Sequence, residues 1–249
     1  MPHSEQLESA AAALGLQLSL GQRDQLMDYL ALIQKWNRVY NLTAVRDPAE
    51  MLTHHLLDSL AVVAPLQRHT QGKPARLLDV GSGAGLPGVV LAIVCPELDV
   101  TCVDTVGKKA AFIQNVANAL KLPTLRGVHA RVEELKAKPF DIVTSRAFSS
   151  LVDFVTWTGF HVKQSDSEAA TTSQAGSMGN TSQAGCIGST SQADCMGSTS
   201  QAGVWMAMKG KRPTDELTAL PATVNVFHVE PLVVPGLDAE RCLVWMRVK

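Results

Sequence analysis

The sequence has no hydrophobic run approaching the roughly 18 residues that a membrane-spanning helix requires. Its first residues, Met-Pro-His-Ser-Glu-Gln, lack the basic and apolar regions of a signal peptide. The five cysteines are scattered and form no C-x-x-C pair, which argues against a zinc site or a disulfide framework. Cys95, Cys102 and Cys242 lie in apolar runs and are predicted to be buried thiols. We therefore expect a cytoplasmic protein without a bound metal or a membrane.

The chain also lacks an excess of positive charge. Its 22 Lys and Arg residues face 23 Asp and Glu residues, which leaves a net charge of −1. If the substrate is a nucleic acid, recognition must come from local basic patches, because bulk charge cannot supply it. Hydrophobic residues make up 46% of the 249 residues, enough for a sizeable core in one large domain or two small ones.

One stretch organises the rest of the chain: the apolar run 77–80 ends in glycines at every second position. This run predicts a buried parallel strand, and residues 86–94 after it are long enough for a helix. Strand, glycine loop and helix together bring a ligand to the carboxyl end of an α/β sheet. Gly81, Gly83 and Gly85 permit the tight turn and remove the Cβ atoms that would keep a ligand off the backbone.

Two acidic residues indicate which ligand this loop binds. Gly83-x-Gly85-x-x-Gly88 fits a dinucleotide fingerprint, but Asp79-x-Gly81-x-Gly83-x-Gly85 fits the pattern of S-adenosyl-L-methionine (AdoMet) enzymes. Asp79 favours AdoMet, because a carboxylate suits its ammonium and sulfonium groups and would repel a pyrophosphate. Asp104 ends the next apolar strand about 20 positions later, where an acidic residue can bind ribose hydroxyls. The alternative is a glycine-rich turn that binds nothing.

From residue 76 onward, strand patterns alternate with helical ones. Strands are predicted at 76–80, 100–104, 125–130 and 140–144 and again from residue 204, with helices at 86–94 and 106–120. This alternation predicts an α/β fold with a parallel sheet and right-handed crossovers. Two final strands, 224–229 and 242–248, predict an antiparallel closing hairpin and hence a mostly parallel, seven-stranded sheet.

The first 70 residues are predicted to form a helical cap on that sheet. Residues 4–20 have near-helical apolar spacing that Gly21 breaks, and 22–40 carry a clear apolar stripe. Asp47 followed by Pro48 predicts the start of a further helix that runs to about residue 64. His54, His55 and Asp58 lie on that helix, where a capping or packing role is favoured because no third metal ligand is suitably spaced.

Residues 164–203 differ in kind from the rest. A nine-residue unit rich in Ser, Thr, Gly and Gln recurs there, with three acids and no Lys or Arg. Such units bury too little apolar surface to offset chain entropy, so a disordered insert is predicted, with a β-solenoid as the alternative. The expected domains are the cap (1–70), a catalytic domain (71–163 with 204–249) and this insert.

Several motifs together resemble one family. They are Leu78-Asp-Val-Gly-Ser-Gly-Ala-Gly-Leu-Pro-Gly88, Trp36-Asn37, Asn41-Leu-Thr43, His55-Leu-Leu-Asp-Ser59 and Ser145-Arg-Ala-Phe148. The chain resembles the small-subunit ribosomal RNA guanine-N7 methyltransferases, also called glucose-inhibited division protein B, from about residue 14 to 248 outside the repeat block. The resemblance implies a class I (Rossmann-like) AdoMet-dependent methyltransferase fold. It also implies methylation of N7 of the guanine at position 527 in 16S rRNA of the small ribosomal subunit. We expect a monomer.

The candidate cofactor-binding residues follow from the loop and the resemblance. They are Asp79, Gly81, Gly83, Gly85, Leu86, Asp104, Val132, Glu133 and Arg146. Val132 could lie on a flat adenine while Glu133 bonds its edge, although a surface turn explains the pattern nearly as well. Arg146 ends the fourth strand, where a charge is expensive unless it binds the carboxylate of AdoMet or a phosphate of the substrate. The resemblance implies the AdoMet contact.

Candidate RNA contacts are Lys209, Lys211 and Arg212, the densest basic cluster, together with Arg46. A solvated surface loop is an equally good interpretation of the cluster. Arg241 resembles a family position whose role the sequence does not reveal. No catalytic base is predicted, because guanine N7 carries a free lone pair and no proton. The alternatives are an AdoMet methyltransferase for a small molecule or protein, a non-catalytic ribosome-binding protein, and an NAD-binding module.

Overall fold

The computed structural model describes residues 2–146, 148–164 and 202–249. The predicted insert 164–203 therefore lies almost entirely outside the described residues. The helices are α1 (Pro2–Ala13), α2 (Leu20–Tyr40), α3 (Pro48–Met51), the π-helix η1 (Leu52–Leu57), α4 (Asp58–Leu60), α5 (Val63–Thr70), α6 (Gly88–Val94), α7 (Gly107–Ala119), α8 (Leu151–Thr158) and α9 (Thr214–Thr218), with 3-10 turns η2 (Val132–Glu134) and η3 (Gly159–His161). The strands are β1 (Ala75–Val80), β2 (Leu98–Asp104), β3 (Leu125–His129), β4 (Ile142–Ser145), β5 (Val204–Lys209), β6 (Val224–Leu232) and β7 (Arg241–Val248).

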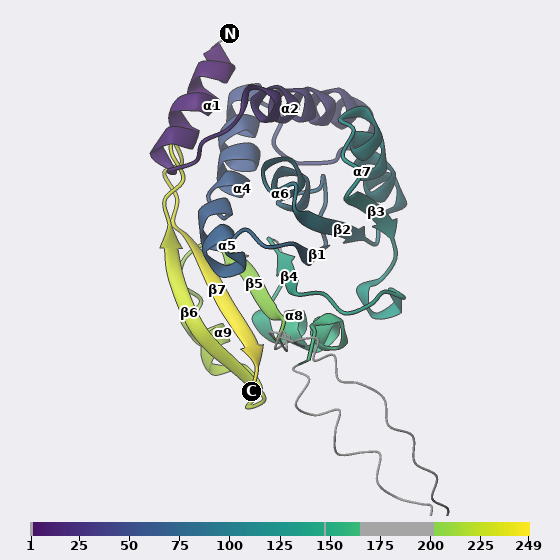
Figure 1. Cartoon of the computed structure of the whole chain (residues 1–249), viewed down its shortest axis with the longest axis vertical. Coiled ribbons are helices and arrows are strands. Elements are labelled where there is room, and N and C mark those ends of the chain that lie inside the picture. The colour runs from purple at the N-terminus through teal and green to yellow at the C-terminus, as the bar shows by residue number, and fades with distance from the viewer. Residues whose placement is uncertain (1, 147, 165–201) are drawn as a thin grey trace, which may run out of the picture.

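The strands form one seven-stranded sheet in the order β3-β2-β1-β4-β5-β7-β6. The first five strands pair in parallel, and β7 runs antiparallel to both β5 and β6. The predicted mostly parallel α/β sheet with its closing hairpin is confirmed (Figure 1). The order in which successive strands are added to the sheet reverses between β1 and β4, although these two strands are parallel. Proteins of the α/β class bind ligands at the carboxyl edge beside such a switch point.

The sheet is covered on both faces, so residues of its central strands are mostly buried in succession rather than alternately. On one face, a large core joins β1, β2 and β5 to the cap helices, α6 and α7. On the other face, a second core packs Leu78 and Val143 against Phe154 of α8. Helices α1, α2 and α6 lie on one side of the strands and α8 on the other (Figure 1).

The cap begins differently from the prediction at Gly21. The first helix ends at Ala13, and the chain turns at Gly15 with a φ of +72°. Helix α2 then starts at Leu20, because Ser19 and Gln22 form a reciprocal capping box, so Gly21 lies inside the helix. The prediction considered the helix-breaking tendency of Gly21 and overlooked Ser19 as the N-cap residue of this helix.

The helix predicted to start at Asp47 is confirmed at its beginning and differs further along. The Asp47 side chain accepts hydrogen bonds from the N–H groups of Ala49 and Glu50. Instead of one helix to about residue 64, the chain forms α3, the π-helix η1, α4 and α5, the last ending at Thr70. Short π-helical segments are rare and occur frequently at functional sites.

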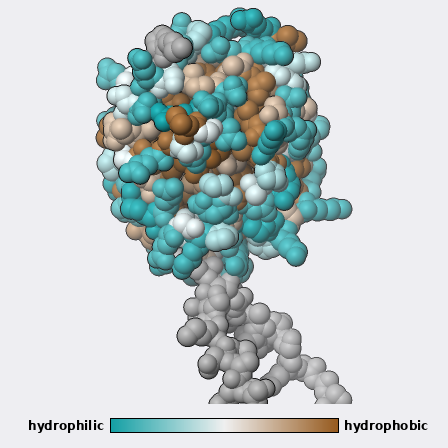
Figure 2. Space-filling model, turned by 45° about the horizontal axis from the view of Figure 1, so that its top comes forward, coloured by the Kyte–Doolittle hydropathy of each residue, from teal (hydrophilic) through white to brown (hydrophobic). Residues whose placement is uncertain are grey.

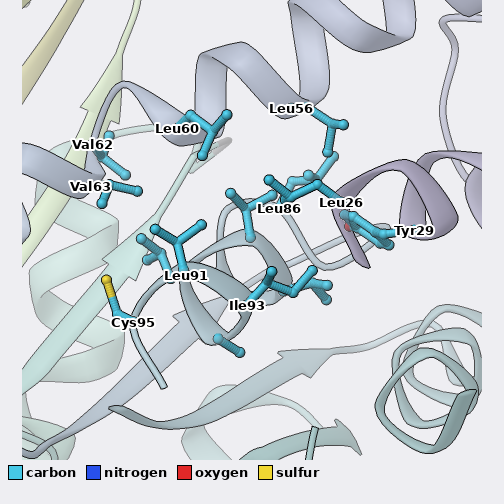
Figure 3. Close-up of a cluster of buried hydrophobic side chains, with 14 of the residues drawn as sticks. Leu26, Tyr29, Leu56, Leu60, Val62, Val63, Leu86, Leu91, Ile93 and Cys95 are labelled. Carbon is cyan, nitrogen blue, oxygen red and sulfur yellow. The ribbon is translucent and has the colours of Figure 1, made fainter. Parts of the chain in front are cut away.

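The cap and the sheet layer share one core rather than meeting across a polar interface. Figure 3 shows Leu26 and Tyr29 of α2, Leu56 of η1 and Leu60 of α4 around Leu86, which lies two positions before the start of α6. All five side chains are almost completely buried. The outer surface differs, since hydrophilic side chains dominate the face in Figure 2 and hydrophobic ones are interspersed in its upper half. None of the described helices is long and apolar enough to cross a membrane.

The described residues on either side of the repeat block lie next to each other. The Gly203 N–H donates to the Lys163 carbonyl at 2.8 Å, and the Lys163 N–H donates to the Phe140 carbonyl at 2.9 Å. Gly203 is buried, and a Cβ atom there would lie 2.7 Å from the Phe140 carbonyl oxygen. Gly203 is thus part of the folded layer although it ends the predicted insert.

Candidate functional site

The glycine loop after β1 forms an open cradle at the carboxyl edge of the sheet. Gly81 and Gly83 adopt φ values of +65° and +59°, a region that side chains with a Cβ rarely enter. A Cβ atom at either position would project into open space, with no atom within 4 Å. The Gly81 N–H donates to the Val103 carbonyl at 2.9 Å, which ties the cradle to the end of β2.

The remaining glycines of the motif serve packing instead. A Cβ atom at Gly88 would lie 2.8 Å from Asp79 Oδ2 and would collide with the Cys102 sulfur. At Gly85 a Cβ atom would collide with Val89. Gly88 therefore lets α6 start directly against β1 and β2, and Gly85 lets the loop fold onto that helix.

Asp79 is completely buried at the end of β1. Its Oδ2 accepts a 2.9 Å hydrogen bond from the Gly88 N–H, and its Oδ1 has no partner among the described residues. Burial raises the pKa of Asp79 from 3.8 to about 7, although the Gly88 N–H and Arg146 oppose this shift. A buried carboxylate oxygen without a partner is a strong acceptor for a ligand cation.

Asp104 organises the other side of the cradle. Its Oδ2 accepts from the Gly83 N–H at 2.9 Å, and its Oδ1 accepts from the Val106 N–H at 2.8 Å. The ammonium of Lys109 lies 4.0 Å from Oδ2. Each carboxylate oxygen can accept a further hydrogen bond, so this residue holds the loop and still has capacity for a hydroxyl group.

A cavity of about 140 Å³, here called the β1–β2 cavity, adjoins the cradle. Its lining residues are Val80, Gly81, Val103, Asp104, Thr105, Ala130, Arg131, Val132, Glu133, Phe148 and Trp157. Val132 is buried and Glu133 is exposed, so an apolar wall and a polar rim stand side by side. Sequence reasoning missed Phe148 and Trp157, whose rings meet edge-to-face with centroids 5.5 Å apart.

This arrangement fits the parts of AdoMet. The orphaned Asp79 Oδ1 suits an ammonium group, Asp104 suits a ribose, and the apolar Val132 wall suits an adenine ring. The open space over Gly81 and Gly83 leaves room for a ligand directly against the backbone. Among the described residues, no group of three His, Cys, Asp or Glu side chains could hold a metal ion.

Five of the nine predicted cofactor residues do not line the β1–β2 cavity: Asp79, Gly83, Gly85, Leu86 and Arg146. Leu86 is buried in the core beside Leu26 and Leu56 (Figure 3), so only its backbone could contact a ligand. Arg146 lies on the other side of β1 and donates to the His54 carbonyl at 3.1 Å and to Asp58 at 3.3 Å. Their roles as cofactor contacts stay predictions.

Arg146 opens instead onto a second cavity of about 290 Å³, here called the Asp58 cavity. It is lined by Val45, His54, His55, Asp58, Arg146, Met208, Lys209, Gly210 and Arg241. The Arg241 Nε–H donates to Asp58 Oδ1 at 2.8 Å, so two guanidinium groups share one buried carboxylate. Burial and the nearby Arg146 lower the pKa of His55 to about 4, which keeps its ring neutral at pH 7.

The predicted RNA contacts fall into two groups. The Lys209 ammonium pairs with Glu216 at 2.8 Å and is mostly buried, so it fastens α9 to the sheet. Lys211 and Arg212 are exposed, and neither forms an ion pair with any carboxylate that the structure describes. Arg46 is also exposed; its neighbour Val45 lines the Asp58 cavity.

One motif in the sequence indicated the Asp58 cavity, but its residues were not predicted to form a site. His55 and Asp58 belong to a motif that contributed to the family resemblance, but an ordinary α-helix was expected there. The π-helix η1 changes which side chains share a face, and residue spacing alone does not reveal it. The three cysteines predicted to be buried thiols, Cys95, Cys102 and Cys242, are confirmed as buried and free.

The family model and the similar known proteins indicate the same family. The family model described as "rRNA small subunit methyltransferase G" matches residues 22–172. "Ribosomal RNA small subunit methyltransferase G" of Paracidovorax citrulli is 56% identical over 255 residues, covering 98% of this chain and 89% of the relative.

Solved structures support the fold. TrmN from Thermus thermophilus is similar with a TM-score of 0.51 at 15% identity, over 80% of this chain and 53% of that chain. The 1,6-didemethyltoxoflavin-N1-methyltransferase of Burkholderia thailandensis, solved with S-adenosylhomocysteine, has a TM-score of 0.50 at 14% identity, over 94% of this chain and 92% of that one. The class I methyltransferase fold expected from the resemblance is confirmed.

Proposed function

Because the chain belongs to the ribosomal RNA small subunit methyltransferase G family, we propose that it methylates N7 of one guanine in 16S rRNA, with AdoMet as donor. The observation that carries this proposal is the family match together with an intact cradle, in which the backbone of Gly81 and Gly83 borders open space and the buried Asp79 Oδ1 has no partner among the described residues. The proposal includes the small ribosomal subunit as the partner. It also includes a monomeric protein that acts in the cytoplasm.

In this proposal the β1–β2 cavity holds the adenosine part of the cofactor. Asp104 binds the ribose, and Val132 and Glu133 receive the adenine beside Phe148 and Trp157. Asp79 binds the ammonium group through Oδ1, and Arg146 binds the carboxylate. When bound, AdoMet supplies an electrophilic methyl group on a sulfonium.

The protein residues have little proton chemistry to perform. Guanine N7 offers a lone pair without a proton, so the chain needs to align the acceptor and exclude water rather than provide a base. A neutral His55 is consistent with that task, because no positive imidazolium faces the electrophile. N7 lies on the major-groove edge, which A-form RNA makes inaccessible, so the target guanine must be unpaired or splayed.

The experiment is methyl transfer from radiolabelled AdoMet to 16S rRNA, as free RNA and as small subunits, followed by mapping of the modified base. We expect one N7-methylguanine per RNA. Gly81→Ala should abolish transfer and weaken S-adenosylhomocysteine binding at least about tenfold, because the added Cβ enters the cradle at a positive φ.

Gly21→Ala is the matched control. Gly21 lies exposed in α2 with open space around it, so alanine should leave transfer unchanged and stabilise the helix by about 0.5–1 kcal/mol. Calorimetric titration with NAD should give no binding. A folded wild-type protein that binds S-adenosylhomocysteine but methylates neither RNA form would refute the proposed substrate.

A further inference from the structure

The Asp58 cluster is an unusual ionic arrangement for a buried site. The Asp58 side chain is 4% exposed, and its two oxygens hold Arg241 at 2.8 Å and Arg146 at 3.3 Å. A buried carboxylate normally needs compensation by one cation. Here two guanidinium groups share it, and each remains about one quarter exposed at the Asp58 cavity.

The cluster is assembled from three distant parts of the chain. The π-helix η1 ends at Leu57, so Asp58 follows directly at the start of α4. Arg146 follows β4, and Arg241 is the first residue of β7. Because β7 runs antiparallel to β5, its first residue lies at the edge where β1, β4 and β5 end, which is also the edge of the glycine cradle.

The charges around this cavity leave a net single positive charge. Lys209 is neutralised by Glu216, and His55 is neutral at pH 7. One Asp58 carboxylate then faces the two guanidinium groups. An arginine held by a carboxylate on one side still presents donors on its other edge, which suits recognition of an oxyanion.

A third cavity continues from this one. The hairpin cavity, about 400 Å³ in volume, shares Gly210 and Arg241 with the Asp58 cavity. Its wall includes the exposed cations Lys211 and Arg212, with Glu240 as the one acid in its lining. Its remaining wall is apolar and comes from the β6–β7 hairpin. Cations along one side and an apolar surface on the other suit single-stranded nucleic acid.

We propose that the Asp58 cavity receives the target guanosine and that Arg241 binds an RNA phosphate at its mouth, with Asp58 as the residue that positions the Arg241 guanidinium. Lys211 and Arg212 bind the next phosphates along the hairpin cavity. The volume of about 290 Å³ is at the small end of ligand pockets and suits one extruded nucleotide rather than a duplex. This inference rests on the proposed RNA substrate, and it assigns Arg241 rather than Lys209 as the central phosphate contact.

The first test measures binding of unmethylated 16S rRNA at a series of salt concentrations. Each lost phosphate contact should reduce the slope of log K against log salt by roughly 0.7. Lys211→Ala/Arg212→Ala should therefore reduce the slope by roughly 1.4 and leave S-adenosylhomocysteine affinity unchanged. The charge-matched control is Lys73→Ala/Lys138→Ala, two exposed lysines that precede β1 and β4 at the opposite edge of the sheet. If both double variants gave the same slope of log K against log salt, the assignment of Lys211 and Arg212 as phosphate contacts would be overturned.

The second test separates a phosphate from the cofactor carboxylate as the anion at Arg241. Arg241→Gln should reduce the slope by roughly 0.7 and raise the KM for RNA about tenfold, while Arg241→Lys should restore the slope because the charge remains. Affinity for S-adenosylhomocysteine should stay within about twofold for both. A parallel loss of cofactor affinity, or an unchanged slope, would overturn the assignment of a phosphate.

The third test concerns Asp58 as a positioning residue. Asp58→Asn should raise the KM for RNA about as much as Arg241→Gln does, and the double variant should cost no more than either single change. A purely structural role predicts instead a lower thermal midpoint and additive effects. Methyl transfer by the wild type is measured in parallel, so that failure of the proposed function and failure of this inference give different results.

Discussion

At the scale of single residues, burial raises the pKa of Asp79, which belongs to the proposed cofactor site. An unfolded aspartate releases its proton near pH 3.8, whereas the folded protein holds this proton to about pH 7. The folded state therefore binds more protons between these values, and stability from this group falls as the pH rises through that window. A cation that binds Oδ1 would favour the ionised form and would release the proton.

Asp79→Asn tests this directly. The amide can still accept from the Gly88 N–H but cannot ionise, so the variant should gain thermal stability relative to the wild type as the pH rises from about 5 to about 8. Its affinity for S-adenosylhomocysteine should fall about tenfold or more, because a charge-assisted bond is lost. Melting curves and calorimetry measure both effects, with the exposed Asp24→Asn as control. Parallel pH profiles of the wild type and Asp79→Asn would contradict the assignment.

At the scale of elements, the cap holds the glycine loop in place. Tyr29 of α2 is fully buried, and its hydroxyl donates to the carbonyl of Ala84, inside the glycine loop, at 2.6 Å. The same ring stacks near Phe112 of α7. Helix α2 therefore holds the loop in place from the side of the cap, and the cap acts indirectly on the proposed cofactor site.

Tyr29→Phe should leave the buried Ala84 carbonyl without a donor. We expect a loss of about 1–3 kcal/mol in the free energy of unfolding and a weaker affinity for S-adenosylhomocysteine, because the loop loses its anchor. Urea unfolding and calorimetry measure the two quantities. Tyr40→Phe, near the exposed end of the same helix, is the matched control and should change neither. Equal effects of the two substitutions would show that the Tyr29 hydroxyl does not anchor the glycine loop.

At the scale of the whole molecule, the fold closes across the repeat block. The backbone hydrogen bond between Gly203 and Lys163 joins the described residues on its two sides. This closure is one reason to expect that the fold tolerates replacement of the repeat block. Composition is a second reason, because the nine-residue units carry few apolar side chains with which to build a core.

Replacement of residues 165–201 by a short Gly-Ser linker should therefore leave the thermal midpoint and methyl transfer nearly unchanged. Gly203→Val should instead destabilise the protein, since its side chain would collide with the Phe140 carbonyl. Melting curves and the rRNA assay compare the two variants with the wild type. Loss of folded protein on replacement would show that the block contributes to the fold.

Local sequence determined much of this protein. The glycine spacing, the apolar strands and the Asp47-Pro48 helix start each reflect physics within a few residues, so the sheet and the cradle were predictable. The family motifs extended this to the activity. Gly21 was misjudged because the Ser19 cap decides that helix start, although that signal was also local.

Only the tertiary structure decided which charges are free and which are paired. Lys209 and Arg241 look alike in the sequence, but Lys209 meets Glu216, whereas Arg241 shares Asp58 with Arg146 and lines two cavities. Asp58 and Arg241 are 183 positions apart in the chain. No residue pattern predicts such a contact, because it depends on the antiparallel direction of β7 and on the π-helical turn before Asp58.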